Sequence, residues 1–127
     1  MEFGIVMTAI IVVVLGTYDI GNFLLQQMKL AEAAEAGGQD AVSYPPTDVN
    51  NASEPNTQIL MGAIASALPQ NWAAGSDYTV TLAQNCICNA GSANERYVTV
   101  TLSRPYRSLL GIPGLAMTTA SYVARIQ

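Results

Sequence analysis

The chain begins with a long run of apolar residues that contains a single charge. Between Phe3 and Leu25 the only charged side chain is that of Asp19. A run of this length meets the requirement of roughly 20 residues for a helix that crosses the hydrocarbon core of a bilayer. Aspartate costs about 3 kcal/mol at the centre of such a helix and less near its end, so the apolar side chains outweigh it. The pattern predicts a transmembrane or filament-core helix over residues 1–25.

Two other interpretations of this run stay open. A cleaved secretory signal is one, because Ala31-Glu32-Ala33 and Ala34-Glu35-Ala36 resemble cleavage sites. However, a signal usually starts with Lys or Arg, whereas this chain starts Met1-Glu2-Phe3, and its apolar run is longer than the usual length of roughly 7–15 residues. The other is a core helix of a soluble protein, which a chain of 127 residues could hardly enclose.

The helix is expected to continue beyond the apolar run over residues 26–36. This segment is rich in good helix formers, and Gly37-Gly38 is expected to end it. A helix from Phe3 to Ala36 would be about 51 Å long, well beyond a hydrocarbon core of about 30 Å. Its second part is amphipathic. Its predicted apolar side holds Met28, Leu30, Ala31 and Ala34, and its predicted polar side holds Lys29, Glu32 and Glu35.

A linker and a short helix are predicted next. Glycine, proline, Asp, Asn and Ser gather in residues 37–56, a composition typical of a linker loop. Ser53, with Pro55 in the first turn, indicates the start of a helix over residues 57–68. Leu60, Ile64 and Leu68 recur at steps of four residues and should share its buried face.

The last part of the chain, residues 78–127, predicts a sheet. Apolar and polar residues alternate with a period of two in 78–82, 98–102 and 120–126, as in half-buried strands. Short antiparallel strands need another layer to be stable. We therefore expect an α+β fold, in which the second half of the long helix and the short helix cover an antiparallel sheet of three to four strands. Residues 26–127 would form this small domain.

The composition argues against several classes of function. The chain has five basic residues and a net charge of −4, whereas nucleic-acid binding needs a basic patch. It contains no histidine, which removes the usual general base and the commonest metal ligand. No pair of carboxylates has a spacing that suits catalysis. We expect no nucleic-acid partner, no enzymatic activity, no metal and no cofactor.

Cys86 and Cys88 are the only cysteines, and they are expected in a loop between two strands. In a secretory context a thiol pair favours a disulfide. A bridge between residues two apart closes a small, strained ring, so free thiols remain an alternative. Tetrahedral zinc would need two further ligands that no other cysteine or histidine supplies.

Several short motifs resemble one family. They are Glu2-Phe3 at the start, Gly16, Asp19 and Gly21 as a Gly-x-x-(Asp or Glu)-x-Gly step, Ala33, Ala34 and Gly37 at the alanine-rich helix end, and Val98-Thr99-Val100, Pro113 and Ala124-Arg125 toward the C-terminus. In this order they resemble the TadE-like pseudopilins of the tight-adherence pilus system, within the type IV pilin-like proteins. Asn22 departs from the family, in which an arginine often follows the glycine.

The resemblance implies a structural subunit of a pilus. Such a protein is inserted once in the bacterial inner membrane with its C-terminal domain in the periplasm, and then enters an extracellular filament. Its implied partners are identical or related pilin subunits, which pack through the N-terminal helix, a prepilin peptidase that removes a basic leader, and the pilus assembly platform. A membrane-anchored periplasmic binding module that does not polymerise is the alternative, and a membrane-tethered enzyme is a weaker one.

The residues expected to serve subunit assembly are Glu2, Phe3, Gly16, Asp19 and Gly21. A carboxylate at Glu2 suits the positive end of the helix dipole, and in an apolar bundle it needs a cationic partner. In pilins that partner is the N-terminal amine of a neighbouring subunit; a solvated carboxylate at the membrane surface is the alternative. Gly16 and Gly21 permit close helix approach or local unwinding, so residues 15–21 are interpreted as a joint that melts locally in a filament.

Overall fold

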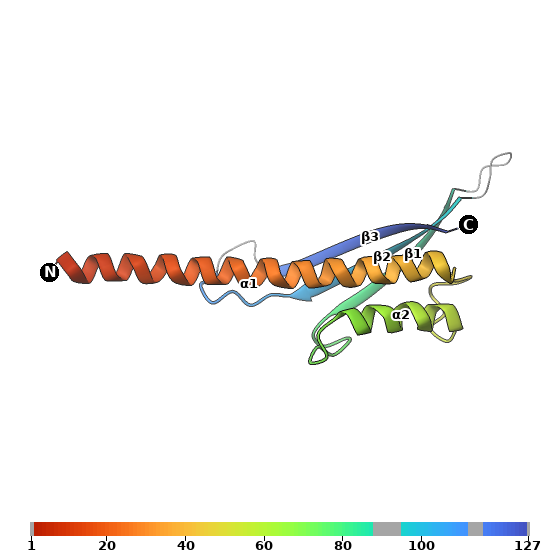
Figure 1. Cartoon of the computed structure of the whole chain (residues 1–127), viewed down its shortest axis with the longest axis horizontal. Helices are drawn as coiled ribbons and strands as arrows, with labels where there is room; N and C mark the ends of the chain where they lie inside the picture. The colour runs from red at the N-terminus through yellow and green to blue at the C-terminus, as the bar shows by residue number, and fades with distance from the viewer. Residues whose placement is uncertain (1, 88–94, 112–115, 127) are drawn as a thin grey trace.

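The computed structural model of the chain describes residues 2–87, 95–111 and 116–126, apart from the side chains of Glu2 and Ile87 (Figure 1). Two helices and three strands follow one another. They are α1 (Glu2–Ser43), α2 (Pro55–Ala67), β1 (Thr79–Ile87), β2 (Glu95–Pro105) and β3 (Met117–Ile126). The predicted α+β fold is confirmed: the C-terminal half of α1 packs on a three-stranded antiparallel sheet, and α2 packs beside α1.

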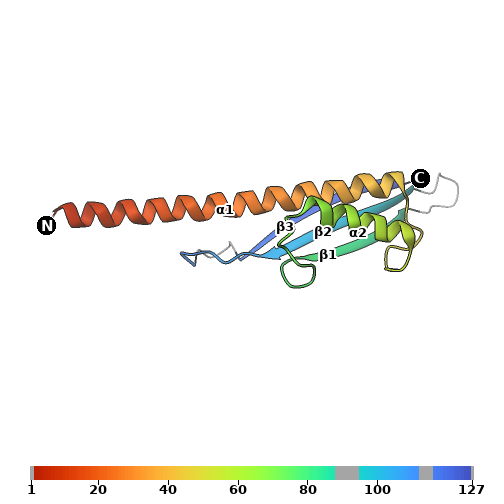
Figure 2. The ribbon, with the colours of Figure 1, turned by 60° about the horizontal axis from the view of Figure 1, so that its bottom comes forward.

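Helix α1 has two halves in different surroundings. With 42 residues it is about 63 Å long. Its N-terminal half projects away from the rest of the molecule, whereas its C-terminal half lies along the sheet (Figures 1 and 2). The two halves of one helix thus differ in what surrounds them, and the predicted domain boundary at residue 25 stays a prediction.

The predicted end of this helix was wrong, because α1 continues through Gly37 and Gly38 to Ser43. A Cβ atom on Gly37 would lie 2.6 Å from Cγ1 of Ile64, and one on Gly38 would overlap the ring of Tyr122. The glycines thus allow α2 and β3 to approach the helix closely. Close packing offsets the cost of about 1 kcal/mol that each glycine brings to a helix interior.

The buried side of the second half of α1 follows the helical period. Buried residues recur at steps of three and four, which places them on one face. They are Leu30, Ala33, Ala34, Gly37, Gly38 and Ala41. The predicted burial of Met28 and Ala31 was wrong, since Met28 is 61% exposed and Ala31 is exposed as well. Met28 precedes Leu30 by about 200° around the helix, so it points to the opposite side.

The predicted linker over residues 37–56 was too long, because only residues 44–54 connect α1 to α2. Glu54 organises this connection: its carboxylate accepts hydrogen bonds from the backbone N–H of Thr47 at 2.7 Å and of Asp48 at 2.9 Å. The hydroxyl of Thr47 donates a further bond at 2.8 Å. These bonds, that from the N–H of Thr47 first, hold the pKa of Glu54 below its ordinary value.

Helix α2 begins one residue after Glu54, with Pro55 in its first turn. The interpretation of Ser53 as the opening residue was therefore wrong by one position, and the helix ends at Ala67 rather than at residue 68. The predicted apolar face is confirmed, because Leu60, Ile64 and Leu68 are all buried. This face brings α2 against the glycine-containing part of α1.

The sheet has the order β1-β2-β3, and all its neighbours are antiparallel. The period of two is confirmed on the central strand, where Val98, Val100 and Leu102 are completely buried. In the register, Val100 pairs with Leu82 on one side and with Tyr122 on the other. Inward side chains of all three strands therefore form the floor on which α1 lies.

Both cysteines were expected in a loop, and for Cys86 this expectation was wrong. Cys86 belongs to β1, where it pairs with Arg96 of β2. Cys86 takes part in a disulfide. Cys88 lies outside the described residues, as does Pro113 of the family motifs.

Candidate functional site: the Asp19 junction

Asp19 is buried within an otherwise exposed part of the helix. Only 1% of the residue is exposed, whereas its neighbours Tyr18 and Ile20 are exposed by 59% and 49%. The cover comes from the segment that follows β2, residues 106–110. Figure 2 shows this segment as the part of the domain that reaches furthest toward the N-terminus along α1.

The carboxylate of Asp19 accepts a set of hydrogen bonds from this segment. Oδ1 accepts from the hydroxyl of Tyr106 at 2.9 Å and from the N–H of Leu109 at 3.2 Å. Oδ2 accepts from the hydroxyl of Ser108 at 2.5 Å and from the N–H of Leu110 at 3.2 Å. All these donors are neutral. Because a carboxylate strengthens each bond, they compensate for its removal from water without a cationic partner.

Tyr106 fixes the position of the segment on the helix. Its hydroxyl also donates to the backbone carbonyl of Asp19 at 2.8 Å. Its ring meets Phe23 edge to face, with 5.4 Å between the ring centroids. Phe23 lies one helical turn after Asp19, on the same side of α1. The backbone N–H of Tyr106 donates to the carbonyl of Ala116 at 3.0 Å, which ties the segment to the start of β3.

The two glycines of the motif differ in their surroundings. A Cβ atom on Gly16 would lie 3.8 Å from Cδ1 of Leu110, at ordinary contact distance, so Gly16 lies directly under the segment. A Cβ atom on Gly21 would meet nothing within 4 Å. Helix α1 is continuous through both positions. Local melting of residues 15–21 in a filament stays a prediction.

We call the contact of Asp19 with residues 106–110 the Asp19 junction. The remaining predicted assembly residues lie apart from it. Phe3 is 75% exposed and lies about 24 Å along α1 from Asp19. Glu2 is in the first turn of the helix. The structure thus brings together Gly16 and Asp19, but leaves Glu2, Phe3 and Gly21 outside the junction.

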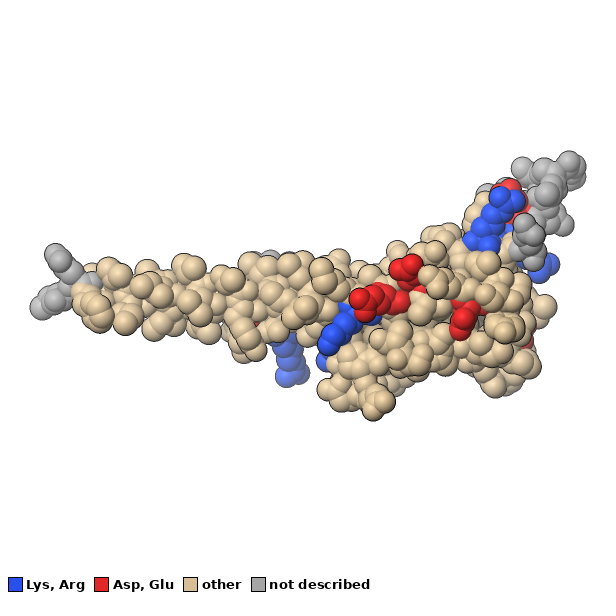
Figure 3. Space-filling model, viewed as in Figure 1, with Lys and Arg blue, Asp and Glu red and all other residues tan. Residues whose placement is uncertain are grey.

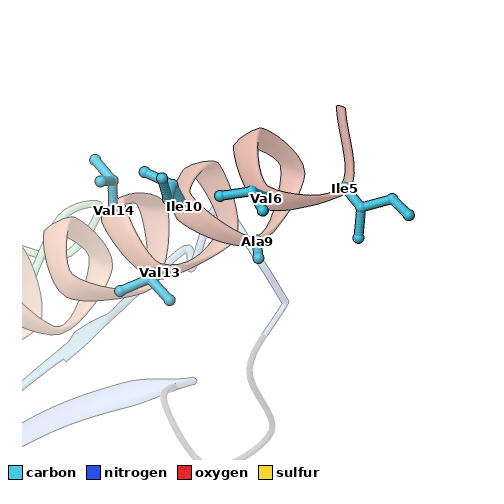
Figure 4. A pocket seen from close by; sticks show the side chains of 6 residues that line it. All are labelled: Ile5, Val6, Ala9, Ile10, Val13 and Val14. Carbon is cyan, nitrogen blue, oxygen red and sulfur yellow. The ribbon is translucent and has the colours of Figure 1, made fainter. Parts of the chain in front are cut away.

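The projecting half of α1 is apolar on every side. Figure 3 shows no acidic or basic side chain along it on the visible face. The large apolar residues from Phe3 to Leu15 are exposed by 38% to 75%. Six side chains, shown in Figure 4, line a shallow hollow of about 420 Å³: Ile5, Val6, Ala9, Ile10, Val13 and Val14. They all come from one helix, so the hollow is a groove in its surface.

By length and composition α1 can cross a membrane. Its most apolar stretch of 18 residues has a mean hydropathy of 2.1, and only 6% of this stretch is buried. The core helix of a soluble protein would be mostly buried. A signal sequence near the N-terminus, however, has the same composition.

Sequence reasoning missed the partners of Asp19. Residues 106–110 read as part of a connection between two strands, and nothing in their spacing points to a position on α1. The available signal was chemical: a carboxylate in an apolar helix needs donors, and Tyr106 and Ser108 supply two hydroxyls on neighbouring positions. Among the described residues, no group of three or more His, Cys, Asp or Glu side chains could hold a metal ion.

No family model, curated protein or solved structure matches this chain. The resemblance to TadE-like pseudopilins therefore depends on the sequence motifs alone. The projecting apolar helix and the Asp19 junction beside it are the features of the fold that bear on function.

Proposed function

We propose that this protein is a structural, non-enzymatic pilin-like subunit of the TadE-like class, which assembles through the N-terminal half of α1. One observation carries the proposal. A helix that is apolar and exposed around its whole circumference projects from a folded domain and continues without a break into its core. A helix of this kind is stable in lipid or among similar helices, but not in water.

The junction at Asp19 supports a role in which the helix bears load or is packed by neighbours. The hydrogen bonds of Asp19 and the contact of Tyr106 with Phe23 fix residues 106–110 on α1, in addition to the core packing that holds the second half of the helix on the sheet. A simple membrane anchor would work equally well with a flexible connection. A subunit that packs in a regular filament needs its domain at a fixed position relative to the packed helix.

The packing of the domain on α1 also argues against removal of the first half of the helix as a cleaved signal sequence. The candidate cleavage sites at 31–33 and 34–36 lie inside α1, where Ala33 and Ala34 are buried by 99% or more. Cleavage there would remove Leu30, a fully buried core residue, and the whole Asp19 junction. Loss of so much of the core would unfold a domain of this size.

The test combines microscopy with one substitution. Surface material sheared from cells is examined by electron microscopy, and the filaments are analysed by N-terminal sequencing and mass spectrometry. We expect this chain in the filaments. Glu2→Ala should leave the protein in the membrane and folded but should prevent its incorporation, whereas Glu32→Ala, at an exposed position of α1 beside the domain, should incorporate normally.

One outcome would contradict the proposal, and another would contradict only the role of Glu2 in it. The wild-type protein could remain a membrane-bound monomer in cells that make it, without entering any filament, which would favour the non-polymerising binding module. Alternatively, filaments could incorporate Glu2→Ala as well as the wild type, which would remove the assembly role of Glu2.

A further inference from the structure

Residues 106–110, which cover Asp19, lie beside the apolar part of α1. Leu110 reaches Gly16, while α1 continues to present apolar side chains on the C-terminal side of this level. Ile20, Leu24 and Leu25 are exposed by 49%, 49% and 57%. Gly16 lies closer to the inserted end of α1 than these three side chains, so a bilayer that covers them also covers Gly16. The segment therefore cannot remain in bulk water while α1 is inserted to Leu25.

The tip of the segment is itself apolar. Leu109 is 69% exposed and Leu110 is 41% exposed. Irregular backbone is costly in lipid because its N–H groups lose their hydrogen bonds to water. Here the N–H groups of Leu109 and Leu110 both donate to the carboxylate of Asp19. The aspartate thus lowers the cost of placing this backbone in an apolar layer.

Basic side chains lie behind the two leucines. Arg104 and Arg107 line a polar hollow of about 430 Å³, together with Gln26 of α1, Asp77 and Tyr106. Gln26 lies about 15 Å along the helix from Gly16, on the side of the domain. In Figure 3 basic side chains gather where the domain meets the projecting helix.

The two arginines are available to an external anion. Among the described residues neither forms a salt bridge. Arg107 is exposed, and Arg104 lies over the ring of Trp72 at 3.6 Å, which holds its guanidinium in place. Asp77 is turned to the backbone, since its carboxylate accepts from the N–H of Ala73 at 2.8 Å. Guanidinium groups bind phosphate oxygens well.

We infer that this end of the domain is a lipid-binding surface, on which Leu109 and Leu110 enter the boundary between head groups and acyl chains while Arg104 and Arg107 bind lipid phosphates. The apolar face of an interfacial segment is typically buried about 5–10 Å into this boundary. The inference rests on the membrane-inserted state of the proposed function. It adds a second membrane contact, which sets how deep the domain sits before assembly.

The test measures the depth of Leu109 in the bilayer. Trp72 is the only tryptophan, so Trp72→Phe removes the native indole emission while it keeps an aromatic ring for the guanidinium of Arg104. In this background Leu109→Trp is compared with Val123→Trp, at a 58% exposed position of β3. Both full-length proteins are reconstituted in phosphatidylcholine vesicles with acyl chains brominated near the head group. We expect the tryptophan at position 109 to lose most of its emission and the one at position 123 to lose little.

A second variant addresses the arginines. Addition of an anionic phospholipid should increase quenching at position 109, and added salt should reverse the increase because it screens the charges. Arg107→Gln in the Leu109→Trp protein should remove most of this response. A response unchanged by Arg107→Gln would overturn the role of the arginines.

The outcomes separate this inference from the proposed function. Vesicle flotation first reports whether the chain is inserted. An inserted chain whose residue 109 is quenched no more than residue 123 would overturn the lipid contact and leave the pilin proposal intact. Shielding of residue 109 in filaments alone, without quenching in vesicles, would assign the leucines to a neighbouring subunit and overturn the inference. Failure to float would overturn the inserted state itself, and the inference with it.

Discussion

The hydroxyl of Tyr106 donates to both the side chain and the backbone carbonyl of Asp19, a residue 87 positions earlier in the chain. This pair joins the end of the sheet to the middle of a helix that is otherwise bare at this level. The contact explains how a charged residue can lie in an apolar run, since its carboxylate is satisfied by its own chain. It adds to the packing of the core, in which Leu30, Ala33 and Ala34 hold the second half of α1 on the sheet.

Tyr106→Phe should destabilise the folded protein by about 1–3 kcal/mol, because it leaves buried acceptors at Asp19 with fewer donors. Thermal unfolding of the detergent-solubilised protein, followed by circular dichroism, measures the change. Tyr44→Phe removes the hydroxyl of a tyrosine that is 52% exposed and serves as the matched control. Equal stabilities of the two variants would show that the Tyr106 hydroxyl contributes nothing.

Asp19→Asn should loosen residues 106–110 without unfolding the sheet. The amide keeps the size of the side chain, but one of its two ends becomes a donor and faces donors of the segment, at a cost of about 1–3 kcal/mol. Hydrogen exchange of the backbone amides of Leu109 and Leu110 should accelerate, while exchange in β2 stays slow. Asp40→Asn, near the end of α1, should leave all these rates unchanged. If both leucine amides stayed protected in Asp19→Asn, the Asp19 carboxylate would not be what holds residues 106–110 on the helix.

Gly37→Ala should destabilise the domain by about 1–3 kcal/mol, because the new methyl group would overpack against Ile64. Chemical unfolding in detergent measures the loss. Gly62→Ala in α2 is the control, since a Cβ atom there meets nothing within 4 Å. It should be stabilising by about 0.5–1 kcal/mol, as alanine is the better helix former. If both variants were stabilised, close packing would not be the reason for Gly37.

The connection between the helices should weaken in acid because of Glu54. Its pKa is lowered in the folded protein, so its contribution is complete above the ordinary value of 4.5 and is lost as the pH falls through the lower folded value. Unfolding measured as a function of pH should show a decline below about pH 4.5 that is smaller in Glu54→Gln. Glu35→Gln, with an exposed carboxylate on α1, should retain the wild-type decline. An identical decline in Glu54→Gln would reject the role of this carboxylate.

The predictions from sequence succeeded where the pattern is periodic. Val98, Val100 and Leu102 alternate along the chain and are buried together, and Leu60, Ile64 and Leu68 share one face of α2. Periodicity reports which side of an element meets the core, because side-chain direction follows from the backbone alone. It does not report where an element ends when packing overrides local propensity.

The glycines demonstrate this limit. Gly37-Gly38 is a common helix stop, yet in this fold both positions are helical because Ile64 and Tyr122 lie against them. The neighbours come from α2 and β3, which are distant in the chain, so no local rule could identify them. The placement of Cys86 in β1 was missed for a similar reason: pairing with Arg96 extends the strand beyond its apolar alternation.

The sequence by itself determined that α1 has an apolar first half and an amphipathic second half. It also determined the strands and their inward faces, since all of these follow from composition and period. Only the tertiary structure decided what Asp19 does. Its donors are backbone groups and hydroxyls of a connection between β2 and β3, and their arrangement exists only after the sheet has packed against the helix. The charge that marks the apolar run is thus a local feature of the sequence, whereas its partners are a property of the fold.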